Sequence, residues 1–406
     1  MSNILVLCSG YFGKAAANGL CAREIVKELE NEGHRVGVIS VGTDDITCLS
    51  LDGAHEKQII YKKNKQLTVT KNVIVKAWRL GSLFLHSWRP KHNKDVVRKM
   101  TALAKEQCRE NAIDAIVCVF FPLEAVLSGY GTKKQFPDAK YIIYELDSVA
   151  DGIAGGSKWH KPIVFSYKRI MGKVYKKADR VIVMESHGKH WSTEHAKSLT
   201  KMKISDLPVL VAPCLPKVEK DGSDIKFLYS GALFESFRSP KKLLDTFKLL
   251  DVENCTLDFY TKGCETELES ARQLDSRITC HGYVDKKELD AAIADADVLV
   301  SLGNAVSNSI PSKVITYMTY GKPIIHFSLQ EKDVCAGYLE KYPLSLVIKH
   351  NEDIAMTKEK IETFVKTARG KTVGLDLIKA RLEMNTPSYS ANLITQVLDG
   401  GRDGST

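Results

Sequence analysis

Short runs of hydrophobic residues alternate with helix-like stretches along most of the chain. The first run, residues 3–8, precedes a glycine-containing turn, and an amphipathic helix pattern then covers residues 15–32. A second hydrophobic run at residues 36–39 completes a strand–helix–strand unit. Strands that alternate with helices predict an α/β fold built on parallel sheets.

The same arrangement begins again at residues 225–231, a predicted strand that ends in glycine. Between the two regions, residues 205–224 contain three prolines and a polar run, so we place a domain boundary there. Two such halves predict two Rossmann-like domains that face each other across a cleft. The predicted parts are an N-terminal domain (1–210), a C-terminal domain (211–385), and a terminal helix with a frayed tail (386–406), a helix that can return to the N-terminal domain.

The most informative stretch, residues 308–325, has the pattern of a loop, a short helix and a buried strand. Pro311 suits the first position of a helix, and Gly321 can take the left-handed conformation that ends one. Ser312 and Lys313 then lie in the first turn, where free N–H groups and the helix dipole attract anions. This pattern favours a phosphate site, although an ordinary helix after a loop has the same residues.

Composition limits the class of protein. With 406 residues, 44% hydrophobic and 26% charged, the chain is long enough for two globular cores. Its ten cysteines form no C-x-x-C pair and no cysteine–histidine cluster at zinc spacing. This pattern indicates a reducing compartment and argues against a structural metal. Because we find neither a signal-like N-terminus nor a membrane-spanning hydrophobic run, we expect a cytoplasmic protein.

Positive charge is concentrated in the first half of the chain. Residues 1–200 contain 31 Lys and Arg against 20 Asp and Glu, whereas the remainder contains 27 against 29. Within residues 57–109, basic residues are interleaved with aromatic and aliphatic ones. This mixture predicts contact with an anionic membrane surface, as for a peripheral protein on the inner face of the membrane, or with a polyanionic ligand. A solvated basic face is the alternative, and nucleic acid is not expected because no nucleic-acid-binding motif accompanies the charge.

A carboxylate follows another predicted strand. Residues 140–144 form a hydrophobic run, and Asp147 comes shortly after it. Side chains at the carboxyl end of a parallel strand point into the crevice where α/β proteins bind ligands. Asp147 is therefore a candidate catalytic residue, and a helix cap is the alternative.

Laid out in this order, the chain resembles the GT-B glycosyltransferases, particularly glycosyltransferase family 4 (glycosyl transferases group 1). The resemblance covers almost the whole length and depends on five segments. They are 10–18 with its glycine turn, Tyr229-Ser230-Gly231, Gly282-Tyr283-Val284, Pro311–Met318, and Gly321-Lys322-Pro323-Ile324-Ile325. The last two resemble the helix with which the family binds its donor.

The resemblance implies the reaction and its partners. It implies transfer of a sugar from a nucleotide-sugar donor, such as a UDP-linked one, with retention at the anomeric carbon and with neither a metal nor another cofactor. The acceptor would be a polysaccharide, a lipid-linked sugar or another glycan, as in polysaccharide biosynthesis. Two alternatives remain open: a nucleotide-sugar epimerase of the same architecture, and a catalytically silent GT-B subunit that binds without reacting.

The resemblance also implies roles for individual residues. Arg238 resembles a basic position that contacts the diphosphate and takes part in catalysis, and Tyr283 lies near the expected nucleobase. The free N–H groups at the start of the helix would contact the same diphosphate oxygens. The full set of expected donor-binding residues is Gly13, Lys14, Gly231, Arg238, Tyr283, Asn308, Ser309, Pro311, Ser312, Lys313 and Thr316.

Three positions depart from the family pattern. Asn308 and Thr316 stand where the family has two glutamates separated by seven residues, and Ala232 stands where a basic residue would follow the glycine. An asparagine can still bond to sugar hydroxyls, but a threonine is shorter and uncharged. These differences indicate either an unusual donor sugar, weak catalysis, or the silent subunit.

Overall fold

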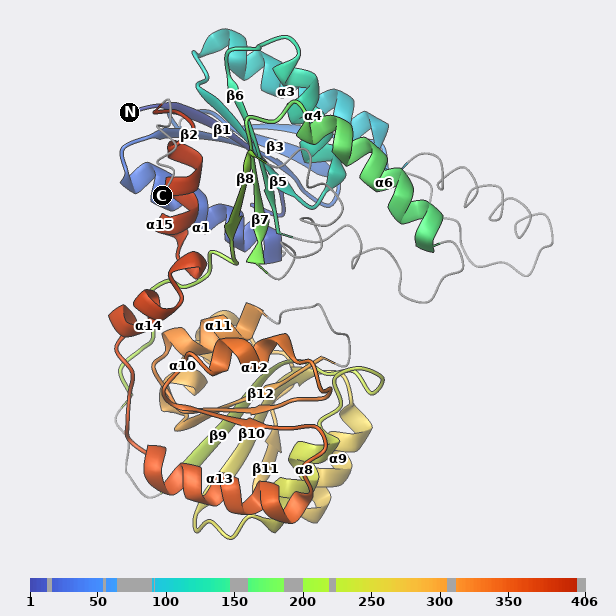
Figure 1. Ribbon diagram of the computed structural model, residues 1–406. Coiled ribbons are helices and arrows are strands. Elements are labelled where there is room, and N and C mark those ends of the chain that lie inside the picture. Colours follow the sequence, from blue (N-terminus) through green and yellow to red (C-terminus); the bar gives the residue numbers. More distant parts are fainter. Residues whose placement is uncertain are drawn as a thin grey trace, which may run out of the picture. The chain divides into compact units, whose positions relative to one another are not determined.

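The computed structural model divides the chain into two compact units (Figure 1). The first unit contains Met1–Val209 together with Met384–Thr406, and the second contains Leu210–Glu383. The residues that the structure describes are 1–12, 17–53, 56–63, 90, 92–146, 160–185, 200–218, 224–304 and 312–399.

One sheet forms the centre of the first unit. Its strand order is β4-β3-β2-β1-β5-β6-β7-β8. Neighbouring strands are parallel except in the β2–β3 and β3–β4 pairs, which are antiparallel. The strands are β1 (Asn3–Ser9), β2 (Arg35–Val41), β3 (Asp45–Leu49), β4 (Glu56–Ile60), β5 (Ala115–Phe120), β6 (Lys140–Glu145), β7 (Arg180–Met184) and β8 (Met202–Ser205).

The helices of the first unit connect strands of this sheet, except for the C-terminal helix, which follows the second unit in the chain. They are α1 (Ala17–Asn31), α3 (Lys94–Glu110), α4 (Leu123–Lys133), α6 (His160–Tyr175) and α15 (Pro387–Thr395), the last preceded by a 3₁₀ turn (Glu383–Asn385). All six residues of β5 are buried, as in a central parallel strand covered on both faces. The Asn93 side chain accepts hydrogen bonds from the Asp95 and Val96 N–H groups, which explains why α3 begins there.

The C-terminal helix α15 packs against α1 of the first unit (Figure 1). A buried hydroxyl network attaches it to the sheet: Tyr144 Oη lies 2.9 Å from Ser390 Oγ and 3.2 Å from Ser205 Oγ. Arg180 Nη1 donates to the carbonyl oxygen of Leu393 at 2.6 Å. The expected return of the terminal helix to the N-terminal domain is confirmed.

The second unit has a sheet in which every neighbouring pair is parallel, in the order β11-β10-β9-β12-β13-β14. Its strands are β9 (Ile225–Ala232), β10 (Cys255–Lys262), β11 (Ile278–Cys280), β12 (Val298–Leu302), β13 (Ile324–Phe327) and β14 (Ser345–Ile348). Its helices are α8 (Lys241–Leu249), α9 (Glu265–Leu274), α10 (Lys286–Asp295), α11 (Ser312–Thr319), α12 (Val334–Leu339), α13 (Ile354–Ala368) and α14 (Leu375–Arg381). Two parallel Rossmann-like sheets are the fold class that the sequence predicted.

Four strands were not among those predicted from the sequence: β3, β4, β8 and β14. β3 and β4 extend the first sheet by antiparallel pairing, which joins Ile46 to Ile59, and β4 is the edge strand. The described part of the basic segment 57–109 contains β4 without its first residue and α3 without its last one, while residues 64–89 and 91 lie outside the described residues. The predicted membrane contact therefore stays a prediction.

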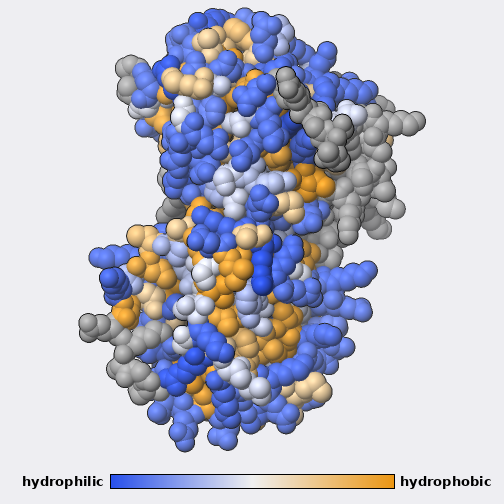
Figure 2. Space-filling model, turned by 60° about the vertical axis from the view of Figure 1, so that its left-hand side comes forward, coloured by the Kyte–Doolittle hydropathy of each residue, from blue (hydrophilic) through white to orange (hydrophobic). Residues whose placement is uncertain are grey.

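The face of the molecule that Figure 2 draws carries many polar side chains. On the face drawn in Figure 2, hydrophilic side chains cover most of the visible first unit, while hydrophobic ones gather over part of the second. Within the described ranges, no helix is both long and hydrophobic enough to cross a bilayer.

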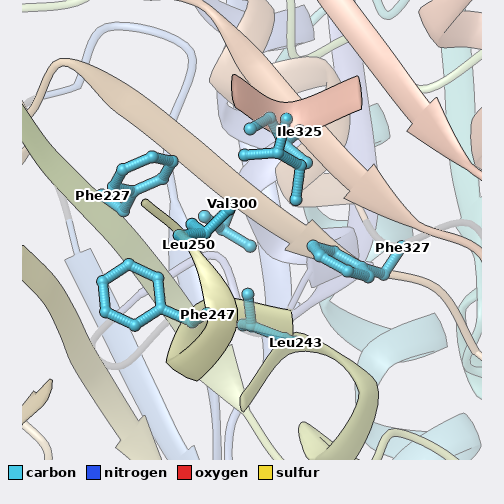
Figure 3. A pocket seen from close by; sticks show the side chains of 8 residues that line it. Phe227, Leu243, Phe247, Leu250, Val300, Ile325 and Phe327 are labelled. Carbon is cyan, nitrogen blue, oxygen red and sulfur yellow. The ribbon is translucent and has the colours of Figure 1, made fainter. Parts of the chain in front are cut away.

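The core of the second unit lies between one face of its sheet and α8 and α13. A small pocket there has a lining that is entirely hydrophobic: Phe227, Leu243, Phe247, Leu250, Val300, Ile325, Phe327 and Ile361. Figure 3 shows side chains of β9, β12 and β13 around this pocket with Leu243 and Phe247 of α8. Because no polar side chain lines it, we interpret the pocket as a packing defect of the core and not as a donor site.

Phe247→Ala should strongly destabilise the second unit. The ring is buried, packs edge-on against Phe227 at 5.7 Å between centroids, and lies 5.0 Å from the Arg277 guanidinium. Its loss should lower the free energy of unfolding by about 3–5 kcal/mol, measured by urea titration with circular dichroism. The exposed Leu249 of the same helix provides the control, since Leu249→Ala should change stability by less than about 0.5 kcal/mol. Equal effects of the two variants would contradict this description of the core.

Tyr144→Phe should loosen the attachment of α15. It leaves buried polar groups of Ser390 and Asp206 without the Tyr144 hydroxyl, at a cost of about 1–3 kcal/mol. Urea titration followed by circular dichroism measures the change. In the control Tyr61→Phe, the removed hydroxyl bonds two exposed carbonyls, and stability should hardly change. Unchanged stability in Tyr144→Phe would show that the network does not hold the helix.

Candidate functional site

Polar side chains gather at the carboxyl edge of the second sheet. Because its strands are parallel, the carboxyl ends of β9 and β12 meet at one edge, where α11 also begins. Ser230 lies at the end of β9, and Asn304 follows β12. This is the edge at which open α/β sheets bind ligands.

Ser230 is the centre of one cluster at this edge. Its hydroxyl lies 2.8 Å from Lys313 Nζ, which donates to it, and 2.9 Å from Tyr317 Oη. The Ser230 N–H also donates to Tyr317 Oη at 2.9 Å. Ser230 and Tyr317 are buried, so the lysine amine is held by a rigid neutral oxygen.

Arg238 forms the second cluster. Its Nε donates to Asn304 Oδ1 at 2.8 Å, its Nη2 bonds the same oxygen, and its Nη1 donates to the Ala232 carbonyl at 3.2 Å. The loop is closed by backbone bonds in both directions between Phe234 and Arg238, at 2.8 and 3.2 Å. Every acceptor is a neutral oxygen, so these contacts orient the guanidinium without neutralising it.

We call Ser230, Arg238, Asn304, Lys313 and Tyr317 the candidate anion site. Its two cations affect each other. Burial of the amine, followed by the charge of Arg238, lowers the pKa of Lys313 to about 8, although part of this side chain remains exposed. A negatively charged phosphate between Lys313 and Arg238 would relieve the repulsion between them and favour the protonated form of Lys313.

Gly231 lets the chain turn at the end of β9. Its φ is +152°, and a Cβ there would lie 3.1 Å from the Tyr229 hydroxyl. The Gly231 carbonyl accepts a hydrogen bond from Thr261 Oγ1 at 2.5 Å. A side chain at this position would therefore disturb the strand end that carries Ser230.

The described residues of the predicted donor helix agree with its expected end, while Pro311, at its expected start, lies outside them. α11 begins at Ser312, and Gly321, with a φ of +69°, follows its end. Thr316 is half-buried on this helix, and its carbonyl accepts from Thr319 Oγ1 at 2.7 Å. Tyr283 is 84% exposed after Gly282, so it is not part of the core and has a free ring for a ligand.

The other predicted site residues are Gly13, Lys14, Asp147, Asn308, Ser309 and Pro311. They lie outside the described residues, so their roles stay predictions.

Three residues of the candidate anion site were not among the predicted site residues. Ser230 was noted only as part of the segment Tyr229-Ser230-Gly231 that carries the family resemblance. Asn304 is the acceptor for Arg238, and Tyr317 was counted only as part of a buried helix face. Asn304 could have been noticed as a polar residue just after a buried strand. The Tyr317–Ser230 contact joins residues 87 positions apart and leaves no local signal.

Comparison with family models identifies the second unit. Residues 224–365 match the model of Glycosyl transferases group 1. The matched region lies within the second unit. It contains every residue of the candidate anion site. Comparison of the sequence with curated proteins gave no match.

Solved structures extend the likeness to the whole chain. The apo form of the lipopolysaccharide outer core galactosyltransferase WaaB is 12% identical, with 98% of this chain and 99% of that chain covered and a TM-score of 0.55. A glycosyltransferase from Rickettsia africae ESF-5 is 14% identical, with 98% and 96% covered and a TM-score of 0.56. A putative UDP-N-acetylglucosamine 2-epimerase from Listeria monocytogenes is 10% identical, with 100% and 98% covered and a TM-score of 0.54. At these identities the likeness shows the GT-B fold, which transferases and epimerases share.

Anion binding at this site should weaken at alkaline pH. Below a pKa of about 8 the Lys313 amine is protonated and attracts phosphate; as pH rises above that value the charge is lost. The affinity for UDP, measured by calorimetry, should fall by up to about tenfold per pH unit above pH 8. Lys313→Arg stays charged and should remove this decline. The same decline in Lys313→Arg would assign it to another group.

Proposed function

We propose that the chain is a retaining glycosyltransferase that uses a nucleotide-sugar donor, UDP-linked in the simplest case. The observation that carries the proposal is the pair of cations, Arg238 and Lys313, held by neutral oxygens at the carboxyl edge of the sheet, in the region that matches the model of Glycosyl transferases group 1. Such a pair suits a diphosphate, which carries more than one negative charge on adjacent groups.

In this reaction the leaving diphosphate is the group whose developing negative charge most needs to be stabilised. The bond between the anomeric carbon and the diphosphate oxygen breaks, and its electron pair leaves on that oxygen. The acceptor hydroxyl oxygen forms the new bond to the anomeric carbon, and its proton passes to the leaving diphosphate oxygen. The negative charge grows on the diphosphate, so fixed cations there stabilise the transition state more than the ground state.

Arg238 and Lys313 would divide this task. The Arg238 guanidinium presents a planar set of donors, and Asn304 holds it in one orientation. The N-terminus of α11 adds free backbone N–H groups beside Lys313. Since side chains and a helix dipole supply the positive charge, we propose that the transfer needs no metal ion.

The positions expected to contact the donor sugar are where this chain differs from the family pattern. Thr316 lies on α11 where the family pattern has a glutamate, and its hydroxyl can still exchange hydrogen bonds with a sugar or ribose hydroxyl. We propose that Thr316, with Asn308, accommodates a donor sugar different from the usual ones. Tyr283, whose ring is exposed, would stack on the nucleobase.

The acceptor is proposed to be a glycan or a lipid-linked sugar. The basic segment 57–109 motivates a lipid-linked one, because Lys and Arg near aromatic residues favour anionic membrane surfaces. Binding to anionic vesicles would favour such an acceptor over a soluble glycan.

A nucleotide-sugar epimerase is the second candidate, since one similar fold is described as a putative UDP-N-acetylglucosamine 2-epimerase. A transferase and an epimerase would both have to bind the diphosphate in the same way. An epimerase, however, changes the donor when no acceptor is present. Incubation with nucleotide sugars alone, followed by chromatography of the sugars, separates them. A new nucleotide sugar without acceptor would support the epimerase and overturn the transferase.

Arg238→Ala should reduce sugar transfer by at least about 100-fold while the protein stays folded, because the leaving diphosphate loses its oriented cation. The matched control is Arg272→Ala, which removes an exposed arginine paired with Glu269 in the same unit. Donors are first found by thermal shift with UDP-, GDP- and ADP-sugars, because binding raises the melting temperature. Normal turnover in Arg238→Ala, or no nucleotide sugar that binds, would refute the proposal.

A further inference from the structure

A buried histidine–aspartate pair lies next to the candidate anion site. His326 is on β13, and its Nε2 lies 2.9 Å from Oδ2 of Asp333, the residue that caps α12. The His326 Nδ1 lies 3.1 Å from Oγ of Ser301, its partner in register on β12. His326 is fully buried and the Asp333 side chain is 5% exposed.

Asp333 connects this pair to the segment that carries Asn304. A Cβ on Gly303 would lie only 2.3 Å from Asp333 Oδ2, so the carboxylate packs directly on the Gly303 backbone. The Gly303 N–H donates to the Phe327 carbonyl at 2.9 Å, and Asn304 is the next residue. Any shift of the carboxylate would therefore move the peptide that precedes Asn304.

The pair has its hydrogen-bonding partners within the protein. Asp333 Oδ1 accepts the Cys335 N–H at 2.9 Å, and its Oδ2 faces His326. The nitrogen, oxygen and sulfur donors of His326, Asp333 and Cys335 lie within 4.8 Å of one another, as metal ligands would. Because hydrogen bonds already join the imidazole and carboxylate directly, we interpret the group as a hydrogen-bonded network rather than an ion site.

Stability alone is a poor reason for such a pair. β13 has the sequence Ile324-Ile325-His326-Phe327, and an aliphatic residue in place of the histidine would suit a buried parallel strand better. Replacing a buried ion pair by well-packed hydrophobic residues is often neutral or stabilising. The hydrogen bonds that join Ser301, His326 and Asp333 are directional, and they can hold the neighbouring backbone in one conformation.

We propose that His326 and Asp333 are positioning residues for the candidate anion site. Through Gly303 they hold Asn304 in place, and through Asn304 they orient the Arg238 guanidinium towards the donor diphosphate. The inference rests on the proposed function, because it assigns the diphosphate as the ligand of Arg238. Neither residue touches the ligand.

A double-mutant cycle tests this chain of contacts. The dissociation constant of UDP is measured by calorimetry for the full chain, Asp333→Ala, Arg238→Ala and the double variant, with GDP, ADP and pyrophosphate in parallel. Each single change should weaken binding about tenfold. If Asp333 acts through Arg238, its removal from Arg238→Ala should weaken binding by less than about twofold further. If Asp333→Ala instead caused a general loss of structure, the double variant would weaken UDP binding by the product of the two single factors.

The matched control is Asp275→Ala. Its carboxylate is 10% exposed and pairs with Arg277 at 2.8 Å, but it precedes β11 at the opposite, amino edge of the same sheet. This variant should leave UDP affinity within about twofold of the parent. A control that weakens binding as much as Asp333→Ala would show that any lost carboxylate in this unit has the effect, which would overturn the inference.

Two further variants keep the test decisive if Asp333→Ala does not fold. Gly303→Ala leaves the carboxylate in place but puts a methyl group against it, and should weaken UDP binding through the same displacement. Asp333→Asn keeps an acceptor for Cys335 and gains a donor for His326, so it should retain affinity within about threefold. Parent-like affinity in Gly303→Ala would overturn the positioning role.

The outcomes distinguish the two proposals. If no nucleotide binds, or if Arg238→Ala binds UDP normally, the proposed function fails and this inference fails with it. If Arg238→Ala weakens binding while a folded Asp333→Ala binds normally, or while the two effects multiply in full, only the positioning role of Asp333 and His326 is refuted.

Discussion

Two like charges held close together by neutral oxygens are the constraint on which the rest of this site depends. Burial lowers the pKa of the Lys313 amine, and repulsion by the charge of Arg238 lowers it further. Among the described residues, directional bonds to the neutral oxygens of Asn304, Ala232 and Ser230 hold the two cations. Carboxylates in these places would remove the repulsion but also weaken the attraction for an anion.

The parallel sheet makes this arrangement possible. It brings the carboxyl ends of β9 and β12 to one edge, and α11 is the next described helix after β12 in the chain. The hydrophobic core on the face of the sheet under α8 and α13 contributes rigidity but no ligand contact. The same fold occurs in transferases and in a putative epimerase, so the function has to be argued from the residues at the edge and not from the fold.

The candidate site could be predicted only in part. Lys313 stands within a recognisable helix start, and Arg238 follows a strand that ends in glycine, so local pattern was enough to select both. Asn304 and Tyr317 contact partners that are 66 and 87 residues away in the sequence, and a local pattern of hydrophobic residues does not predict such contacts. The strand β4 was missed because a short, exposed edge strand resembles a loop in sequence.

By itself, the sequence determined the alternation of strands and helices, the glycines and prolines at their ends, and hence two Rossmann-like halves. These features follow from local backbone preferences and from the periodicity of hydrophobic residues. Only the tertiary structure decided which elements are neighbours: α15 beside α1, Tyr317 on Ser230, Asp333 on Gly303. The reason is physical, because a long-range contact depends on chain closure and packing and not on the residues adjacent to it in the chain.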